Sequence, residues 1–529
     1  MPKHRSDKST DAQALTRRRF LEQLGVVGGS SLVMTAMTSW DLMAGQAGVR
    51  PALTGRPKSA RVIVLGAGVS GLTVAYELGK LGYDYRILEA RDRVGGLNWT
   101  ARKGTEHTEL VTGERQVCTF DEGQYVNVGP WRVPYTHTGV LNYCKELGVP
   151  VQLFVNEADN NYFYYEPRTE GPNLGPLTGK KVRLREVKAD LIGYTNELLV
   201  KAIDQSKLDL PLTAEDKQRY VSFLISEGYL DSSSRAYKAF NTRGPGNPYE
   251  FAALLQSGFG NRMRSVPATD GTAAAPIFQP VGGMDQFPKG FQRAIGPNKI
   301  TFNAEVQSVH QDDQGVKIVY LDTKSGKKTE VSADYVVVCM PLNVLSAVDI
   351  NLSPDMMAAV KATTYSNSAK MGLQMKRRFW EEDDKIFGGH LYSNLPLGEF
   401  SYPSNDYFSQ KGVLLGVYSN GGPPVAELFD KPVKERVEHV LMHASKVHPQ
   451  IRQEFESAYA VWWRKVKYSQ GGYASGGAVA RRAQLQKVDN RIVIGSAATA
   501  PYSQPDWQEG AVAAGWLALK SVHERAMRS

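Results

Sequence analysis

A glycine-rich turn between an apolar segment and a helix-like segment constrains the fold of this chain more than any other feature. Residues 62–65 are apolar β-formers, and residues 72–81 carry apolar side chains at helical spacing. Between them, Gly66 permits a tight turn, Gly68 lets the backbone approach a pyrophosphate, and Gly71 lets the helix pack closely on the strand. This pattern predicts a strand–turn–helix unit that binds a dinucleotide at the helix N-terminus.

An acidic residue follows this unit at the separation expected for ribose binding. Residues 85–89 predict a second strand, which ends in Glu89, 18 residues after Gly71. A glycine turn alone is weak evidence, but strand, turn, helix, strand and acid occur here in the order that a Rossmann-type fold requires. We therefore predict an α/β protein (α+β overall) with a Rossmann-type cofactor-binding domain.

The other secondary-structure signals separate that domain into distant stretches of chain. Strand signals return at residues 299–309, 316–322, 334–340 and 491–495, and a helix is predicted at 509–525. Residues 151–275 resemble an inserted helical domain, with helical spacing at 184–208 and 214–230. The predicted cofactor-binding domain comprises 59–101, 284–348 and 486–523, and a mixed-sheet substrate-binding domain comprises 102–150, 276–283 and 349–485.

The composition excludes several classes of protein. Hydrophobic residues make up 42% and charged residues 22% of the 529 positions, which excludes a disordered chain. Three cysteines exclude a disulfide scaffold and a thiolate zinc cage. His439 and His443, four apart on a predicted helix, fit a solvated face better than a metal site. We expect no metal.

The positive charge of the chain is concentrated near its N-terminus. Of the formal charge of +9, residues 1–58 supply +5, from nine Lys/Arg against four Asp/Glu. The segment Thr16-Arg17-Arg18-Arg19-Phe20-Leu21 precedes a weakly apolar stretch, residues 24–37, and resembles a Tat export signal. The alternative is a chance arginine run before an amphipathic helix. We expect cleavage near residues 44–47, a periplasmic or secreted protein without an integral membrane segment, and no nucleic-acid partner.

Several motifs together resemble those of the flavin-containing amine oxidase superfamily, most closely its L-amino acid oxidase branch. They are the glycine turn, residues 89–96 (Glu-Ala-Arg-Asp-Arg-Val-Gly-Gly), residues 280–288 around Gly282-Gly283-Met284, and residues 495–511. The resemblance implies FAD as the cofactor. No cysteine follows Cys339, so the C-terminal cysteine that tethers FAD in monoamine oxidases is missing and we expect non-covalent binding. A second glycine fingerprint for NAD(P)H is absent from the sequence, so the substrate is expected to supply the electrons.

The resemblance implies a specific set of FAD-binding residues. They are Gly66, Gly68, Val69, Ser70, Gly71, Glu89, Ala90, Arg91, Arg93, Gly96, Gly129, Pro130, Trp131, Arg132, Val306, Gly495, Gln508, Glu509, Gly510 and Ala511.

A fifth segment, Gly129-Pro-Trp-Arg-Val-Pro134, indicates the substrate class. It is similar to the stretch in L-amino acid oxidases whose arginine binds the substrate carboxylate, which makes Arg132 the candidate here. A guanidinium matches a carboxylate with two parallel hydrogen bonds that a plain amine cannot use. The alternative is a structural ion pair. The resemblance also assigns Tyr418, in a predicted strand at 413–418, to the carboxylate; a core tyrosine is the alternative.

Three further residues are implied by the same resemblance. Trp507 and Trp463 would flank the substrate amine with aromatic faces, although either could be a core aromatic, and adjoining Trp462 must face away from Trp463 on a strand. Lys370 matches the lysine that family members place near flavin N5, where a cation would stabilise negative charge during transfer of electrons to oxygen. Its alternative is an exposed lysine at the start of a strand.

The preferred function is FAD-dependent oxidation of L-amino acids by O2 to 2-oxo acids, ammonia and hydrogen peroxide. The alternatives are a tryptophan-type amino-acid 2-monooxygenase that forms an amide, an amine or polyamine oxidase, and a non-catalytic flavoprotein. We expect a homo-oligomer, a dimer or larger. Side-chain preference is expected to depend on residues 151–275 and on the surroundings of Tyr402; Glu227 could favour cationic substrates but reads as an exposed helix acid.

Overall fold

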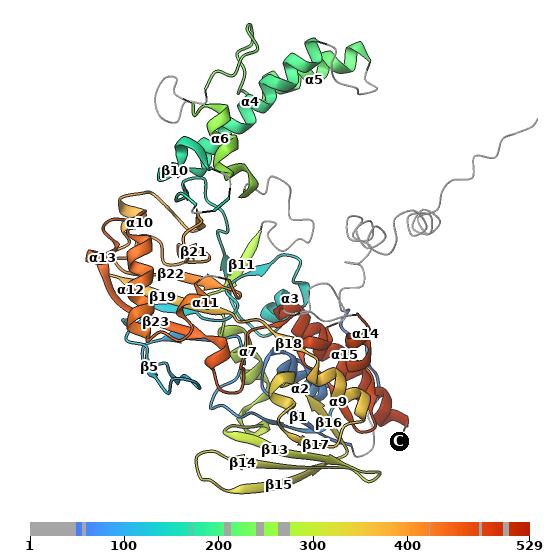
Figure 1. The fold of residues 1–529 in the computed structure, drawn as a ribbon. Coiled ribbons are helices and arrows are strands. Elements are labelled where there is room, and N and C mark those ends of the chain that lie inside the picture. The colour runs from blue at the N-terminus through green and yellow to red at the C-terminus, as the bar shows by residue number, and fades with distance from the viewer. Residues whose placement is uncertain are drawn as a thin grey trace, which may run out of the picture.

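The computed structural model describes residues 49–55, 60–168, 170–171, 173–205, 213–239, 248–262, 276–422, 424–475, 479–500 and 507–528. The arginine motif at 16–21 and the predicted cleavage region therefore lie outside the described residues. None of the helices in the described ranges combines the length and apolar character needed to cross a bilayer. Figure 1 shows two sheet-containing bodies and a group of helices that projects from them.

A six-stranded sheet joins segments from the beginning, middle and end of the chain. Its order is β12 (Ile300–Thr301), β2 (Asp84–Leu88), β1 (Arg61–Leu65), β16 (Tyr335–Val338), β26 (Ile492–Ile494) and β25 (Val488–Asp489). All neighbours pair in parallel except β25, which runs antiparallel to β26. Parallel pairing aligns the carboxyl ends of these strands, so the loops that follow them meet at one edge.

Both faces of this sheet are covered, as a parallel sheet requires. Val62 and Val64 face α2 (Val69–Lys80) and α15 (Gln508–Arg528), whereas Ile63 and Leu65 face a second sheet. That second sheet has the order β15 (Lys328–Ala333), β14 (Val316–Asp322), β13 (Ala304–Gln311) and β17 (Asp349–Ile350). The alternation of burial along β1 therefore follows from its place between two apolar layers.

Two sequence expectations are corrected in this region. The strand predicted over 299–309 is broken into β12 and β13, which belong to different sheets, because Asn303 between them turns the chain with a φ of +58°. The strand predicted over 334–340 ends at Val338, so Cys339 follows β16, is partly exposed and lines a cavity described below. Burial of the thiol nonetheless raises the pKa of Cys339 to about 12.

A seven-stranded sheet forms the second body. Its order is β10 (Val182–Arg183), β9 (Tyr162–Tyr164), β20 (His390–Ser393), β21 (Phe400–Ser401), β22 (Gly412–Ser419), β19 (Ala369–Met375) and β23 (Phe455–Trp462). One face packs against α12 (Val433–Ala444), through residues such as Leu373, Val417 and Val440. The opposite face packs against a core that contains Trp131 and Trp463. The two faces are thus distinct, and only the second approaches the loop at 128–132.

The α-helices in the described part of the predicted insertion project away from both sheets (Figure 1). They are α4 (Leu184–Asp204), α5 (Ala214–Ser226) and α6 (Phe251–Ser257). Its first part nevertheless contributes β9 and β10 to the seven-stranded sheet. Glu227 follows α5, is exposed, and accepts a hydrogen bond from Asn196 at 2.8 Å.

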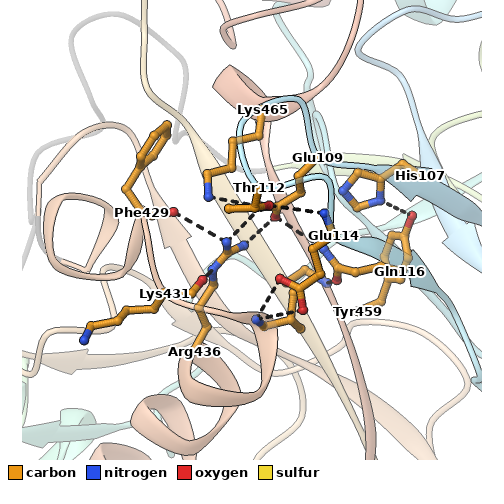
Figure 2. A network of polar contacts seen from close by, with 12 residues as sticks. His107, Glu109, Thr112, Glu114, Gln116, Phe429, Lys431, Arg436, Tyr459 and Lys465 are labelled. Atoms are coloured by element: carbon orange, nitrogen blue, oxygen red, sulfur yellow. Dashed lines mark hydrogen bonds and ion pairs between the residues drawn. The ribbon is translucent and has the colours of Figure 1, made fainter.

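A fully buried charge cluster ties the second body together (Figure 2). Glu109 accepts hydrogen bonds from the Arg436 guanidinium at 2.5 and 2.9 Å and pairs with Lys465 Nζ at 3.0 Å, and no side chain of the three is exposed. Burial acts to raise the pKa of Glu109, but the two cations hold it below its usual value. The cluster joins the turn after β4 (Glu106–Thr108) to α12 and to η5 (Trp463–Lys465).

This cluster also supports the loop at 128–132. Trp463, at the start of η5, donates its indole N–H to the carbonyl of Val128 at 2.8 Å. Lys370 Nζ donates to the carbonyl of the next residue, Gly129, at 2.5 Å. A buried anion therefore fixes η5, and η5 in turn fixes a loop whose residues the sequence assigns to cofactor and substrate.

We predict that Glu109→Gln destabilises the protein strongly. The amide keeps the shape of the side chain but leaves two buried cations without an anion, which costs about 3–5 kcal/mol. Urea unfolding of the purified holoprotein measures the change. Glu106→Gln is the matched control, because Glu106 is exposed and pairs with the exposed Arg115. Equal unfolding free energies for the two variants would contradict the prediction.

Candidate active site

A cavity of about 410 Å³ lies at the edge of the six-stranded sheet where β1, β2, β16 and β26 end. Its walls come from the turn after β1, the end of β2, β13, the segment 467–474 and the start of α15. The predicted cofactor residues that line it are Gly66, Gly68, Val69, Ser70, Glu89, Ala90, Arg91, Gly96, Pro130, Val306, Gln508 and Ala511. Ligands of open parallel sheets bind at this edge.

The glycine turn faces open space at Gly68 and packs closely against the backbone at Gly71. Gly66 has a φ of +104°, which favours glycine. A Cβ atom on Gly71 would lie 2.0 Å from the carbonyl oxygen of Gly66, so no side chain fits there. A Cβ on Gly68 would meet no atom within 4 Å, and it would occupy the cavity instead. The geometry fits a phosphate-bearing cofactor at Gly68.

Glu89 is held rigidly at the cavity wall. One of its oxygens accepts the N–H of Ala67 at 2.7 Å, and the other accepts the N–H of Arg91 at 2.9 Å. A carboxylate has about four acceptor positions, so these two bonds orient the group and leave capacity for the hydroxyls of a ribose.

Other predicted cofactor residues support the cavity from behind. Arg93 donates to the carbonyls of Val94 and Gly96 at 3.3 and 3.0 Å, lies over the Trp99 ring, and has its pKa lowered to about 9 by burial. Glu509 accepts the N–H groups of Gly139 and Val140 at 2.8 and 2.9 Å and so caps α3 (Thr138–Glu146). The predicted residues that are not among the described cavity lining are Gly71, Arg93, Gly129, Trp131, Arg132, Gly495, Glu509 and Gly510.

Lys370 is buried rather than exposed. Its side chain lies 4.7 Å from the ring centre of Trp131 and 4.4 Å from that of Tyr418, its partner across β19 and β22. Burial lowers the pKa of Lys370 well below its usual value, the nearby Arg132 lowers it further, and Glu399 acts in the opposite direction. The structure thus brings Lys370, Tyr418 and Arg132 together.

The partly buried Arg132 has an amide partner and no carboxylate partner among the described residues. Its Nη1 donates to Asn156 Oδ1 at 2.5 Å, and its guanidinium lies 5.5 Å from the ring centre of Trp131. A buried or half-buried cation is normally paired with an acid. Arg132 therefore retains donors for an incoming anion.

Sequence reasoning missed the residues that hold Arg132. His390 Nε2 lies 3.3 Å from Asn156 Oδ1, and His390 Nδ1 lies 2.5 Å from Ser401 Oγ. Burial and the Arg132 charge lower the pKa of His390 to about 3, so the ring is neutral. Nε2–H then donates to Asn156 and the Ser401 hydroxyl donates to Nδ1. His390 and Ser401 lie in short strands and Asn156 in the loop after β8 (Val151–Leu153), none of them within a motif, so only their contacts could have identified them.

The two tryptophans occupy different places. Trp507 lines the cavity, with its ring 5.5 Å from that of His137. Trp463 is only 2% exposed, packs in the core beneath the loop at 128–132, and is not part of the described cavity wall. Trp462 is buried on the opposite face, with α12. His439 and His443 lie with ring centres 4.5 Å apart, and the described residues include no group of three or more potential metal ligands.

Comparisons with known proteins agree with this geometry. The family model "Flavin containing amine oxidoreductase" matches residues 69–520. The chain is 27% identical over 442 residues to "L-amino acid oxidase bordonein-L" of Crotalus durissus terrificus, covering 79% of this chain and 78% of that protein. It is 28% identical over 436 residues to an "L-amino-acid oxidase" of Demansia vestigiata, covering 79% and 77%.

Solved structures share the fold. Putrescine oxidase bound to putrescine superimposes with a TM-score of 0.57 at 20% identity, covering 88% of this chain and 99% of that chain. Cyclohexylamine oxidase from Brevibacterium oxydans gives a TM-score of 0.58 at 18% identity, covering 89% and 100%. The expected fold class and family resemblance are confirmed: the chain belongs to the flavin-containing amine oxidoreductases and is a flavin-dependent oxidoreductase.

Proposed function

We propose that this protein is an FAD-dependent L-amino acid oxidase, which converts an L-amino acid, O2 and water to a 2-oxo acid, ammonia and hydrogen peroxide. The observation that carries the proposal is Arg132, a partly buried guanidinium without a carboxylate partner among the described residues, beside Lys370 and Tyr418. A free guanidinium at this place suits a substrate carboxylate, which plain amines lack. The similarity to L-amino acid oxidases supports the same class.

The residues of the cavity would hold FAD without a covalent bond. Gly68 and the N-terminal amides of α2 would receive the pyrophosphate, and Glu89 a ribose hydroxyl. Gln508, whose Oε1 accepts a hydrogen bond from Asn98 at 2.7 Å, would face the cofactor from the start of α15. No cysteine follows Cys339 in the sequence, which supports non-covalent binding.

The chain's own groups would place the substrate for reaction. A bound flavin supplies the acceptor for the two electrons lost at the substrate Cα. Arg132 and Tyr418 would hold the α-carboxylate, with Asn156 and His390 fixing the guanidinium. Trp507 would exclude water from the amine end of the site. Lys370, poised with a lowered pKa, would take up a proton when negative charge appears beside it.

The domain organisation, location and assembly are part of the proposal. The ranges 59–101, 284–348 and 486–523 contain all six strands of the parallel sheet and would form the FAD-binding domain. The arginine motif at 16–21 supports export of the folded protein to the periplasm or beyond. The family resemblance supports a homo-oligomer.

Product analysis tests the proposed reaction. Purified yellow protein is incubated under air with L- and D-amino acids, and peroxide, ammonia and carbon products are measured. The proposal expects peroxide and a 2-oxo acid from L-forms only. An amide with loss of CO2 would instead identify a 2-monooxygenase, and faster turnover of the decarboxylated amines would identify an amine oxidase.

We predict that Arg132→Ala lowers kcat/KM for L-amino acids by about 10²-fold or more, because hydrogen bonds to a charged group contribute about 1.5–3 kcal/mol each. Turnover of the corresponding amine, which lacks the carboxylate, should be unchanged. Steady-state peroxide assays measure both. Arg235→Ala, which removes an exposed guanidinium paired with Asp204, is the control. Full amino-acid activity in Arg132→Ala would refute the carboxylate role.

We predict that Lys370→Met slows reoxidation by O2 by about 10²-fold, the usual cost of removing one charge-stabilising group from an active site. Anaerobic reduction by substrate should change little. Stopped-flow absorbance separates the two half-reactions. Equal loss in both would mean that Lys370 supports the site structurally rather than through its charge.

Substitutions of the two turn glycines should separate cofactor binding from folding. Gly68→Ala meets free space in the cavity, so the protein should fold normally and bind FAD about tenfold or more weakly. Gly71→Ala drives a Cβ into the Gly66 carbonyl, so the free energy of unfolding should fall by about 3 kcal/mol. Circular dichroism, urea unfolding and visible flavin absorbance measure both effects. The reverse pattern would contradict this assignment of the two glycines.

A further inference from the structure

One face of the seven-stranded sheet carries a row of polar side chains across four neighbouring strands. Phe400, Tyr402 and Leu391 point into the core on the α12 side. Because side chains alternate along a strand, Glu399 and Ser401 lie on the opposite face. His390 of β20 contacts Ser401 of β21, so it lies on that face too. Lys370 and Tyr418 lie on this same face, beside Trp131.

Glu399 is the adjacent neighbour of Tyr418 in this row. Its backbone N–H donates to the carbonyl of Tyr418 at 2.8 Å, and the preceding Gly398 bridges to the same residue. On its other side lies Tyr392, in β20, which pairs with β21. Burial is the main reason that the pKa of Tyr392 is raised, and the carboxylates of Glu157 and Glu399 add to it.

The charges around this face are unequally compensated. Glu157 is paired with Lys188, which also bonds Asp159. Glu399 has no ion pair and no side-chain hydrogen bond among the described residues, and Arg132 has none with an acid. The face therefore presents a cation and an anion that do not pair with each other. Arg132 is held through Asn156 beside His390 of β20. Glu399 lies between Tyr392 of β20 and Tyr418 of β22.

The proposed reaction explains the role of Arg132 on this face but gives no role to Glu399. Hydride loss requires the substrate amine to be neutral, so the reacting amino acid brings one negative charge, its carboxylate. Arg132 compensates that charge. Burial, with Arg132, lowers the pKa of Lys370, whereas Glu399 acts to raise it. Glu399, whose side chain is exposed and therefore accessible to a ligand, would remain a carboxylate without a cationic hydrogen-bond partner among the described residues.

We propose that Glu399 binds the positively charged side chain of the substrate, so that this site prefers L-arginine, L-lysine and L-ornithine over uncharged amino acids. This inference rests on the proposed amino-acid oxidation. Adjacent strands lie about 5 Å apart, so Glu399 is one strand from the place where Tyr418 would hold the carboxylate. A three- or four-carbon side chain spans that separation. Trp131 and Tyr392 offer aromatic faces on which its stem could lie.

Pairs of equal shape and different charge test the proposal. We compare kcat/KM for L-arginine with L-citrulline, and for L-lysine with L-norleucine, in the wild-type holoenzyme and in Glu399→Gln. The wild type should favour each cationic member by at least tenfold. Glu399→Gln should reduce that preference by at least tenfold while changing kcat/KM for L-citrulline and L-norleucine by less than threefold. Glu157→Gln is the matched control and should keep the preference.

Three results would overturn the inference. They are a wild-type preference for the uncharged members, an unchanged preference in Glu399→Gln, or an equal loss for all four substrates with an altered pH profile, which would make Glu399 a proton acceptor. If no amino acid is oxidised, the proposed function fails; calorimetric binding of L-arginine and L-citrulline to both proteins then decides on Glu399 separately, by the same tenfold criteria.

Discussion

The parallel pairing of β1 with β2 and β16, and of β16 with β26, is the constraint on which the rest of the structure depends. These strands come from the beginning, middle and end of the chain. Their alignment brings the glycine turn, Glu89, Cys339 and the start of α15 to one edge, around one cavity. Gly71 lets α2 pack directly against the glycine turn, because any side chain there would separate the helix from the turn.

The second body supplies the residues proposed to bind the substrate, which do not line the cofactor cavity. Its buried anion, Glu109, fixes η5, and Trp463 on η5 fixes the loop that carries Gly129, Pro130 and Arg132. That loop lies over the face of the seven-stranded sheet where Lys370 and Tyr418 stand. The cofactor cavity and the substrate face thus meet at a loop that a buried charge cluster supports, which links fold stability to activity.

Local patterns predicted well what depends on neighbours in sequence. The glycine turn, β2, β14 and α15 follow from composition and periodicity, and Glu89 from its spacing. The break at Asn303 was missed because the strand-like signal of residues 299–309 gives no sign of the left-handed turn that divides it. Asn156, His390 and Glu399 were missed because their roles arise from contacts between segments distant in sequence. Glu509 was placed at the cofactor by resemblance, yet its carboxylate caps α3.

The central claim is that this flavoprotein takes electrons from L-amino acids held by Arg132. Anaerobic titration of the purified holoprotein, followed by the visible absorbance of the oxidised flavin, tests it most directly. The account predicts complete bleaching by an L-amino acid, none by its D-enantiomer, and none by the L-amino acid amide, which lacks the carboxylate. Bleaching by the amide as readily as by the acid, or no bleaching by any L-amino acid, would contradict it.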